Sequence, residues 1–195
     1  MLNFILLSVC AYLLGSVSFA ILLCSMAGYP DPRSRGSRNP GATNVLRIAN
    51  TKIAALVLIL DCIKGWLPVF VASFVLTSKF SLAFIGFFAL LGHLFPVFFN
   101  FSGGKGIATF IGILLALFYP AAVIFCSIWL LIAATTKYSS LASIIAVAST
   151  PVYLLMLYEL EMILPIFAMS LFLLWRHKDN IMRLQGGVES QIHFK

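Results

Sequence analysis

Long apolar runs alternate with short polar stretches along almost the whole chain. The runs cover residues 2–28, 53–77, 82–100, 107–135, 139–157 and 162–175. A helix of about 20 apolar residues is long enough to cross the hydrocarbon core of a bilayer. The pattern therefore predicts an all-α integral membrane protein, and we expect residues 1–195 to form a single transmembrane domain.

The run 107–135 can be interpreted in two ways, because Tyr119 and Pro120 interrupt it. It is either one long kinked helix or two short spans that meet at these residues. Each short span would be a little below the usual length of about 20 residues. The apolar pattern alone leaves both alternatives open.

The positions of the basic residues decide between six and seven spans. With seven spans, four polar segments share one side of the membrane: 29–52, 101–106, 135–138 and 176–195. These segments hold eleven of the thirteen Lys and Arg residues. The eleven are Arg33, Arg35, Arg38, Arg47, Lys52, Lys105, Lys137, Arg176, Lys178, Arg183 and Lys195. With six spans, Lys137 and the tail would change sides. Because cytoplasmic loops are rich in Lys and Arg, we predict seven transmembrane helices, with the N-terminus outside and the C-terminus in the cytoplasm.

Composition supports a membrane protein and changes the meaning of the charge. The chain has 195 residues, of which 62% are hydrophobic and only 10% charged, whereas about a quarter of the residues of a soluble domain are charged. The net charge of +7 would suggest nucleic acid in a soluble protein. Here it indicates basic cytoplasmic loops and anionic ligands, and we expect no nucleic-acid partner.

A polar, basic island at residues 33–47 separates the first two apolar runs. Asn39 followed by Pro40 is typical of a helix start, with Asn39 as the N-cap. The backbone N–H groups of Gly41, Ala42 and Thr43 would then point at one place, where the helix dipole favours an anion. The island therefore predicts a phosphate-binding cradle, and the alternative is a loop that is rich in arginine only for topology.

Two side chains in this island add to the cradle. Thr43 and Arg47 are four residues apart and share a helix face, and Ser37 lies just before the predicted helix start.

A second island of similar character, Ser102–Gly106, precedes the run that begins at residue 107. Gly103 and Gly104 permit a close approach of the backbone to a ligand, and Lys105 adds a point charge. The spacing does not fit a Walker A loop. We expect the apolar remainder of the chain to bring both islands together at one membrane face, where each would bind a phosphate group.

Other polar residues have alternative interpretations. Asp61 and Lys64 lie within a span, three residues apart, and form either an ion pair that fixes helix packing or a ligand contact. Ser139, Ser140 and Ser143 serve either helix packing or binding. His177 and Asn180, at i and i+3 beside basic residues, are ligand candidates, whereas His93 lies in an apolar run and is expected to be structural.

Several enzyme signatures are absent from the sequence. It contains no His-x4-Asp, no Gly-x-Ser-x-Gly, no His-Glu-x-x-His and no acidic cluster for a metal ion. We therefore expect no metal and no cofactor, and no obvious protein nucleophile or base. The alternative function is a membrane transporter of a small phosphorylated anion, but such proteins place their binding residues near the midplane and are usually built from repeated halves.

Five motifs, in order along almost the whole chain, resemble one known family, the bacterial acyl-phosphate-dependent glycerol-3-phosphate acyltransferases (the PlsY family). They are GSRNPGATNVLR at 36–47, DCIKG at 61–65, GHLFPVF at 92–98 with GGKGIAT at 103–109, YSSLAS at 138–143 and RHKDNIMRL at 176–184.

The resemblance implies a seven-span enzyme of the bacterial inner membrane, with its active site on the cytoplasmic face. Such an enzyme transfers an acyl group from acyl phosphate to the 1-hydroxyl of glycerol 3-phosphate. The products are lysophosphatidic acid and phosphate, in the first step of phospholipid synthesis. Expected partners are the two substrates, the lipid bilayer and the enzyme that produces acyl phosphate.

The resemblance also implies roles for individual residues. Ser37 and Arg47 would be essential, and the turn from Asn39 to Asn44 would hold acyl phosphate. The loop with Gly103, Gly104 and Lys105 would hold glycerol 3-phosphate, in a pocket completed by Ser143, His177 and Asn180. Glu189 would have a structural role in the tail. Independently of the resemblance, the ion-pair interpretation of Asp61 and Lys64 makes these two residues structural as well.

Acyl phosphate is already activated, which suggests that catalysis needs only positioning and charge stabilisation. We therefore expect the phosphate of the donor to accept the proton of the attacking hydroxyl. Two positions depart from the family pattern: Arg38 stands where many relatives carry Gly, and Ser18 stands where Pro is frequent.

Overall fold

The structure is a computed structural model that describes residues 1–157 and 159–192. These residues form helices and connecting segments without any strand. The chain divides into two compact units, Met1–Leu117 and Phe118–Lys195, and each is described by itself. Lys195, one of the basic residues counted in the predicted topology, lies outside the described residues. A single domain over residues 1–195 stays a prediction.

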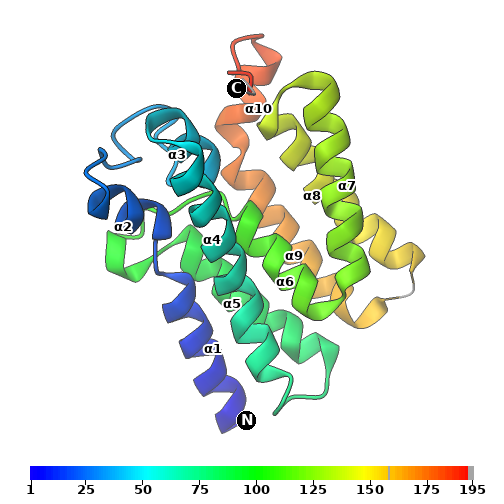
Figure 1. The fold of residues 1–195 in the computed structure, drawn as a ribbon. Coiled ribbons are helices and arrows are strands. Elements are labelled where there is room, and N and C mark those ends of the chain that lie inside the picture. The colour runs from blue at the N-terminus through cyan, green and yellow to red at the C-terminus, as the bar shows by residue number, and fades with distance from the viewer. Residues whose placement is uncertain (158, 193–195) are drawn as a thin grey trace. The chain divides into compact units, whose positions relative to one another are not determined.

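The first unit consists of six α-helices and a short 3-10 helix: α1 (Leu2–Gly15), α2 (Phe19–Met26), α3 (Ala42–Ile48), α4 (Thr51–Ala72), α5 (Lys79–Leu94), η1 (Val97–Phe99) and α6 (Ile107–Leu117). Within it α1 packs along α5, and α4 packs along both α5 and α6 (Figure 1). The short α3 is held by Val45, whose side chain is buried in an apolar cluster with residues of α2 and α4.

Glycines allow two of these helix pairs to approach closely. A Cβ atom at Gly65 of α4 would overlap the carbonyl oxygen of Thr109 on α6, and a Cβ at Gly112 of α6 would overlap that of Cys62 on α4. Likewise, a Cβ at Gly15 of α1 would overlap the carbonyl oxygen of Ala89 on α5, and a Cβ at Gly92 of α5 would overlap that of Tyr12 on α1. Small residues at such positions are the usual means by which membrane helices pack backbone to backbone.

The first apolar run is helical but broken between α1 and α2, at residues 16–18. The break leaves the carbonyl oxygen of Val17 outside the regular helix ladder, and the Lys64 ammonium donates a hydrogen bond to it at 2.7 Å. Broken helices within a bilayer need such partners, because no bulk water is present to pair with the backbone.

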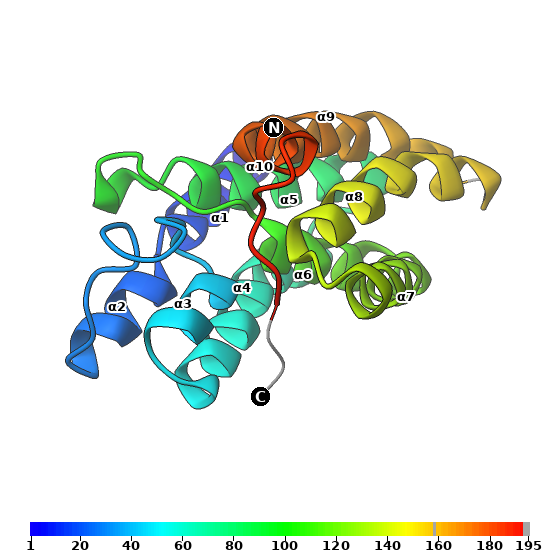
Figure 2. The same cartoon turned by 90° about the horizontal axis from the view of Figure 1, so that it is seen from above.

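The second unit contains α7 (Tyr119–Thr136), α8 (Ser139–Met156), α9 (Leu160–Arg176) and α10 (Lys178–Gln185). In it α8 packs between α7 and α9, and Figure 2 shows α7 and α8 side by side. The hydroxyl of Tyr153 on α8 donates to the carbonyl of Ala121 on α7 at 3.0 Å, which joins this helix pair.

Five helical segments in the described part of the chain are long and apolar enough to cross a membrane: Leu2–Met26, Thr51–Ala72, Lys79–Phe99, Tyr119–Thr136 and Ser139–Met156. Helices α9 and α10, which are bent by 54° relative to each other, would add a sixth segment if they form one broken span. At about 1.5 Å per residue, α6 is short for a complete span. The chain leaves the helical conformation at Phe118 (φ −163°, ψ 91°), so that 107–135 is two helices and not one.

Helix ends differ from the predicted spans at the turn after α4. The predicted span reached residue 77, but α4 ends at Ala72 and the chain turns before α5. Lys79 is the first residue of α5 and not part of the turn, because Ser78 caps this helix by accepting a hydrogen bond from the Ser81 N–H at 3.4 Å. Apolarity alone does not distinguish an apolar turn from the helix that precedes it.

Candidate functional site

Asn44 organises the polar island at residues 33–47. Its side chain is buried, and its Oδ1 accepts a hydrogen bond from the Ser37 N–H at 2.8 Å. Its Nδ2 donates to the carbonyl oxygens of Pro32 at 2.8 Å and Arg35 at 3.0 Å. The predicted substrate contact of Asn44 stays a prediction, but its amide is engaged in folding the loop over the start of α3.

The predicted helix start at Asn39 is wrong. The N-cap of α3 is Gly41, and the helix begins at Ala42. The Asn39 carbonyl accepts a hydrogen bond from the Gly41 N–H at 2.9 Å, which closes a tight turn around Pro40. The Gly41 N–H is therefore not available to an anion, and the N–H groups at the helix start are those of Ala42 and Thr43.

The side chains expected to contact substrate in this island are exposed. Ser37, Thr43 and Arg47 lie at the surface, and within residues 1–157 and 159–192 none of these side chains makes a hydrogen bond or an ion pair. The structure thus separates the island into an inner frame built by Asn44 and an outer set that is available to a ligand. Asn39 is half-buried.

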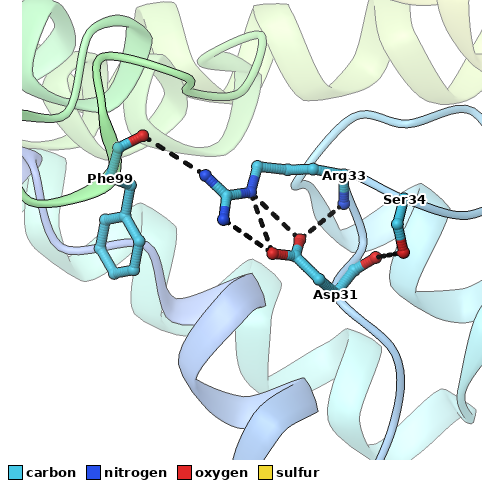
Figure 3. Close-up of polar contacts among 4 residues, drawn as sticks. All are labelled: Asp31, Arg33, Ser34 and Phe99. Atoms are coloured by element: carbon cyan, nitrogen blue, oxygen red, sulfur yellow. Dashed lines mark hydrogen bonds and ion pairs between the residues drawn. The ribbon is translucent and has the colours of Figure 1, made fainter.

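Asp31 and Arg33 form a strap that ties the start of the island to η1 (Figure 3). The Arg33 guanidinium contacts the Asp31 carboxylate at 2.7 Å and also donates to the Phe99 carbonyl at 3.3 Å. The hydrogen bonds from Arg33 lower the pKa of Asp31 against the opposing effect of its partial burial. No feature of the sequence had indicated this strap, because it depends on where η1 lies in space.

The glycine–lysine loop, Ser102–Gly106, lies directly on the end of α5 and beside the first island. The Gly104 N–H donates to the His93 carbonyl at 3.2 Å. A Cβ atom at Gly104 would meet the His93 ring on one side and the Pro40 carbonyl oxygen at 3.1 Å on the other. The expected proximity of the two islands is therefore present, at Gly104 and Pro40. Lys105 follows as a half-buried residue.

Asp61 and Lys64 form the ion pair that was one of the two alternatives for these residues. Their charged atoms are 2.7 Å apart, and both side chains are at least 95% buried. Lys64 also holds the Val17 carbonyl, so the pair braces the break between α1 and α2. The His93 Nδ1 is 3.9 Å from Asp61 Oδ1.

In the second unit, Glu189 gathers three hydrogen-bond donors. Its Oε1 accepts from Ser140 at 2.8 Å and from Asn180 at 2.7 Å, and its Oε2 accepts from Arg183 at 2.7 Å. Burial opposes ionisation of this carboxyl, but these hydrogen bonds outweigh it and lower the pKa of Glu189. The network joins the C-terminal segment and α10 to α8, and it orients the amide of Asn180.

Ser143 and His177 are buried and already hydrogen-bonded in the same unit. Ser143 donates to the Ser139 carbonyl at 2.8 Å and accepts from the Trp129 indole at 3.0 Å. His177 Nδ1 is 2.8 Å from the Leu173 carbonyl. Since a carbonyl can only accept, Nδ1 carries a proton and Nε2 is the acceptor in the neutral ring.

Each unit therefore brings a set of predicted residues together. The first unit joins the two glycine–basic islands. The second joins Asn180 to Glu189 and places His177, three residues before Asn180, on the bend between α9 and α10. The sequence did not indicate Trp129 or the bonding of Ser140 to Glu189. In the described residues no group of three or more His, Cys, Asp or Glu side chains could hold a metal ion.

Comparison with known proteins agrees with this combination of apolar helices and glycine–basic loops. A family model described as glycerol-3-phosphate acyltransferase matches residues 5–187. A glycerol-3-phosphate acyltransferase of Colwellia psychrerythraea is 49% identical over 187 residues, which are 96% of this chain and 95% of the relative. One of Pseudomonas putida is 48% identical over 186 residues, 95% of this chain and 98% of the relative.

A solved structure is similar over the same extent. It is a crystal structure of PlsY, an integral membrane glycerol 3-phosphate acyltransferase, in its glycerol 3-phosphate form. The similarity has a TM-score of 0.93 and 36% sequence identity, and it covers 97% of this chain and 96% of the other. The lysophosphatidic acid form of that protein has a TM-score of 0.91 and the same identity, over 97% of this chain and 95% of the other.

These similarities define the class as an integral membrane acyltransferase fold. The chain belongs to the glycerol-3-phosphate acyltransferase family that includes PlsY. The family predicted from the sequence motifs is thereby confirmed.

Proposed function

We propose that this protein transfers an acyl group from acyl phosphate to the 1-hydroxyl of glycerol 3-phosphate. The products are lysophosphatidic acid and inorganic phosphate. The observation that carries the proposal is the close approach of the two glycine–basic islands at Gly104 and Pro40. Two adjacent anion sites suit a reaction in which both substrates carry phosphate, and the names of the relatives support the acceptor.

In the first unit, Lys105 binds the phosphate of glycerol 3-phosphate, with Gly103 and Gly104 keeping the backbone close. Ser37, in the loop before α3, and Arg47, in the last turn of α3, are both exposed and act on acyl phosphate. The backbone turn from Asn39 to Asn44 carries this donor site through the N–H groups of Ala42 and Thr43. The amide of Asn44 contributes by holding the Ser37 backbone in place.

In the second unit, His177 and Asn180 are the catalytic residues and Ser143 assists binding. Glu189 supports this set, because its carboxylate fixes the Asn180 amide. The Nδ1 proton of His177 is directed to the Leu173 carbonyl, so Nε2 is the acceptor of the neutral ring and interacts with a substrate hydroxyl.

The reaction needs no protein nucleophile in this scheme. The 1-hydroxyl oxygen attacks the acyl carbon, the bond between that carbon and the phosphate oxygen breaks, and the hydroxyl proton passes to the departing phosphate. Correct alignment of two bound reactants can by itself supply about 7–11 kcal/mol of barrier reduction. Lys105 and Arg47 stabilise the negative charge of the phosphates.

A different role for His177 is tested by two variants, His177→Ala and His177→Gln. If the donor phosphate accepts the proton, His177→Gln retains measurable turnover because glutamine can still hydrogen-bond to substrate. Loss of turnover in both variants with normal binding of both substrates would make His177 the general base instead.

The proposal includes a seven-span topology with the N-terminus outside, and a site at the cytoplasmic face of the bacterial inner membrane. The two glycine–basic islands and the tail then share the cytoplasmic side, where Lys and Arg are enriched. The short α6 serves as the fourth span, and α9 as the seventh.

The site assignment is tested in a reconstituted assay with acyl phosphate and glycerol 3-phosphate, following phosphate release. We expect Arg47→Ala and Lys105→Ala to reduce kcat/KM by about 100-fold or more, because a charge-assisted contact to each phosphate is lost. Matched controls are Arg35→Ala, an exposed arginine of the same island, and Lys79→Ala, a lysine distant in sequence from both islands. Retained activity in Arg47→Ala or Lys105→Ala would overturn the site assignment.

A further inference from the structure

His93 lies between a buried ion pair and the glycine–lysine loop. It belongs to the last turn of α5, and its side chain is only 6% exposed. On one side Nδ1 is 3.9 Å from the Asp61 carboxylate, which is beyond direct hydrogen-bond length. On the other side, Nε2 is so near Gly104 that a Cβ atom there would overlap it. The ring is thus a spacer between α4 and the loop.

The loop rests on His93 through its backbone as well. The Gly104 N–H caps the His93 carbonyl at 3.2 Å, and this carbonyl belongs to the last turn of α5, where the helix ladder leaves acceptors unpaired. A Cβ atom at Gly103 would overlap the carbonyl oxygens of both His93 and Leu94. Gly103 and Gly104 therefore lie flat against the end of α5, and the imidazole forms the wall on which Gly104 rests.

We propose that His93 is a positioning residue for substrate binding: its imidazole sets the path of Gly103–Gly104, and thereby the position of Lys105. The inference rests on the proposed role of Lys105 in binding glycerol 3-phosphate. His93 acts through the loop and has no contact with the reacting atoms. The Asp61 carboxylate of the buried ion pair faces the other side of the ring, with its Oδ1 3.9 Å from Nδ1.

A residue that served only packing would behave differently. Leu90, one turn earlier on α5, is completely buried. Truncation of its side chain should lower stability without changing the KM of one substrate more than that of the other. Loss of the His93 ring should instead alter the position of Lys105 and raise KM for glycerol 3-phosphate selectively. The contact of ring and glycine also predicts that the effects of changes at residues 93 and 104 depend on each other.

The test is a double-mutant cycle with His93→Ala, Gly104→Ala and the double variant, measured with acyl phosphate and glycerol 3-phosphate in the reconstituted protein. We expect His93→Ala to raise KM for glycerol 3-phosphate about tenfold and KM for acyl phosphate less than about twofold, as small displacements of a binding group have large effects. Gly104→Ala should lose about 100-fold in kcat/KM. The kcat/KM of the double variant should be about tenfold higher than that of Gly104→Ala, because removal of the ring makes room for the methyl group.

The control variant is Leu90→Ala, for which we expect a lower unfolding temperature and unchanged KM values. If His93→Ala does not fold, His93→Gln replaces it, and we expect an intermediate KM because glutamine fills part of the ring volume. The role of His93 would be overturned if the losses of kcat/KM in the two single variants simply multiplied in the double variant. It would also be overturned if the KM for glycerol 3-phosphate were unchanged in the residue-93 variants. Absence of turnover in the wild type would overturn the proposed function, and the inference with it.

Discussion

At the scale of single residues, the shape of the first island depends on very few side chains. One buried amide, Asn44, holds three points of the preceding loop. Two positions in that loop, Gly36 and Arg38, have φ near +59°. Such a conformation is easy for glycine and unfavourable for arginine. The island therefore combines a strong internal frame with one strained position.

Replacing Asn44 by alanine should destabilise the protein and impair catalysis together. The Ser37 N–H and the carbonyls of Pro32 and Arg35 would lose their partner, and unsatisfied polar groups of this kind reduce stability by about 1–3 kcal/mol each when buried. Thermal unfolding in detergent and the kcat/KM of the same sample measure the two effects. Thr43→Ala is the control for stability, since its exposed hydroxyl holds nothing in the described structure, and an equal loss of stability there would contradict the role of Asn44.

Arg38→Gly should stabilise the loop. A left-handed conformation costs a non-glycine residue about 1–2 kcal/mol, and glycine loses part of that gain through its greater freedom in the unfolded chain. We expect a small rise in unfolding temperature with activity retained, because Arg38 is exposed and has no proposed role in binding. A fall in unfolding temperature would mean that the Arg38 side chain makes a stabilising contact.

At the scale of helices, polar contacts hold the places where regular helix is interrupted. The pair of Asp61 and Lys64 faces the break between α1 and α2, and the Glu189 network holds α10 and the segment after it to α8. In both cases a charged side chain forms hydrogen bonds with polar groups that are not paired within a regular helix. The helices themselves are held by apolar contacts and by glycines that permit close approach.

Lys64→Met should be much more damaging than the double variant Asp61→Leu/Lys64→Met. The single change leaves the Asp61 carboxylate buried without its cation, which typically costs about 3–5 kcal/mol, whereas replacing both charges by apolar groups removes most of that penalty. The double variant should remain below the wild type, because the Val17 carbonyl still lacks its donor. Unfolding temperatures in detergent measure all three proteins, and an equally unstable double variant would contradict this explanation.

The Glu189 network should make the C-terminal segment sensitive to acid. The pKa of Glu189 is lowered in the folded protein, so the folded state binds fewer protons than the unfolded state between the two pKa values. Its contribution is complete above the ordinary glutamate pKa of about 4.3 and disappears as the pH falls through the lower folded value. Hydrogen exchange of α10 measured over this range should show the loss of protection.

Glu189→Gln is the matched control for that pH dependence. Glutamine keeps the size of the side chain but cannot ionise, so α10 should exchange faster than in the wild type near neutral pH and show little further change on acidification. An unchanged acid response in Glu189→Gln would show that another group titrates.

The sequence predicted the helices well because a long apolar run in a membrane can satisfy its backbone only as a helix. It also predicted that the islands at 33–47 and 102–106 would meet. The helix start at Asn39 was wrong because the Asn–Pro signal is local, and the turn that Asn39 makes with Gly41 delays the helix by two residues.

Other parts of the site could not be predicted, because they depend on residues that only the fold brings together. The strap from Arg33 to the Phe99 carbonyl spans 66 residues, and the bond between Ser140 and Glu189 spans 49. The position of His93 against Gly104 likewise depends on how the loop returns to the end of α5. No periodicity or composition in the sequence carries such information.

At the scale of the whole molecule, the order of spans decides which polar segments share a membrane face. The break at Phe118 separates α6 from α7, and the seven-span topology treats them as separate crossings. Lys79 and Lys137 then lie on opposite sides. With α6 and α7 forming one span, both lysines would lie on the same side.

Single cysteines at these two positions test the topology in intact inverted and right-side-out vesicles. The background should lack the four native cysteines, including the exposed Cys10. We expect a membrane-impermeant maleimide to label Lys137→Cys from the cytoplasmic face and Lys79→Cys from the outer face. Labelling of both from the same face would contradict the seven-span topology.

We propose that this chain alone transfers an acyl group from acyl phosphate to glycerol 3-phosphate. The most direct measurement uses the purified protein in lipid, with mass spectrometry of the lipid product and quantification of phosphate in the same reaction. We predict lysophosphatidic acid acylated at the 1-position and one phosphate released for each molecule formed, with no product when acyl-CoA replaces acyl phosphate. Phosphate release without the acylated product, or no reaction with acyl phosphate, would contradict the claim.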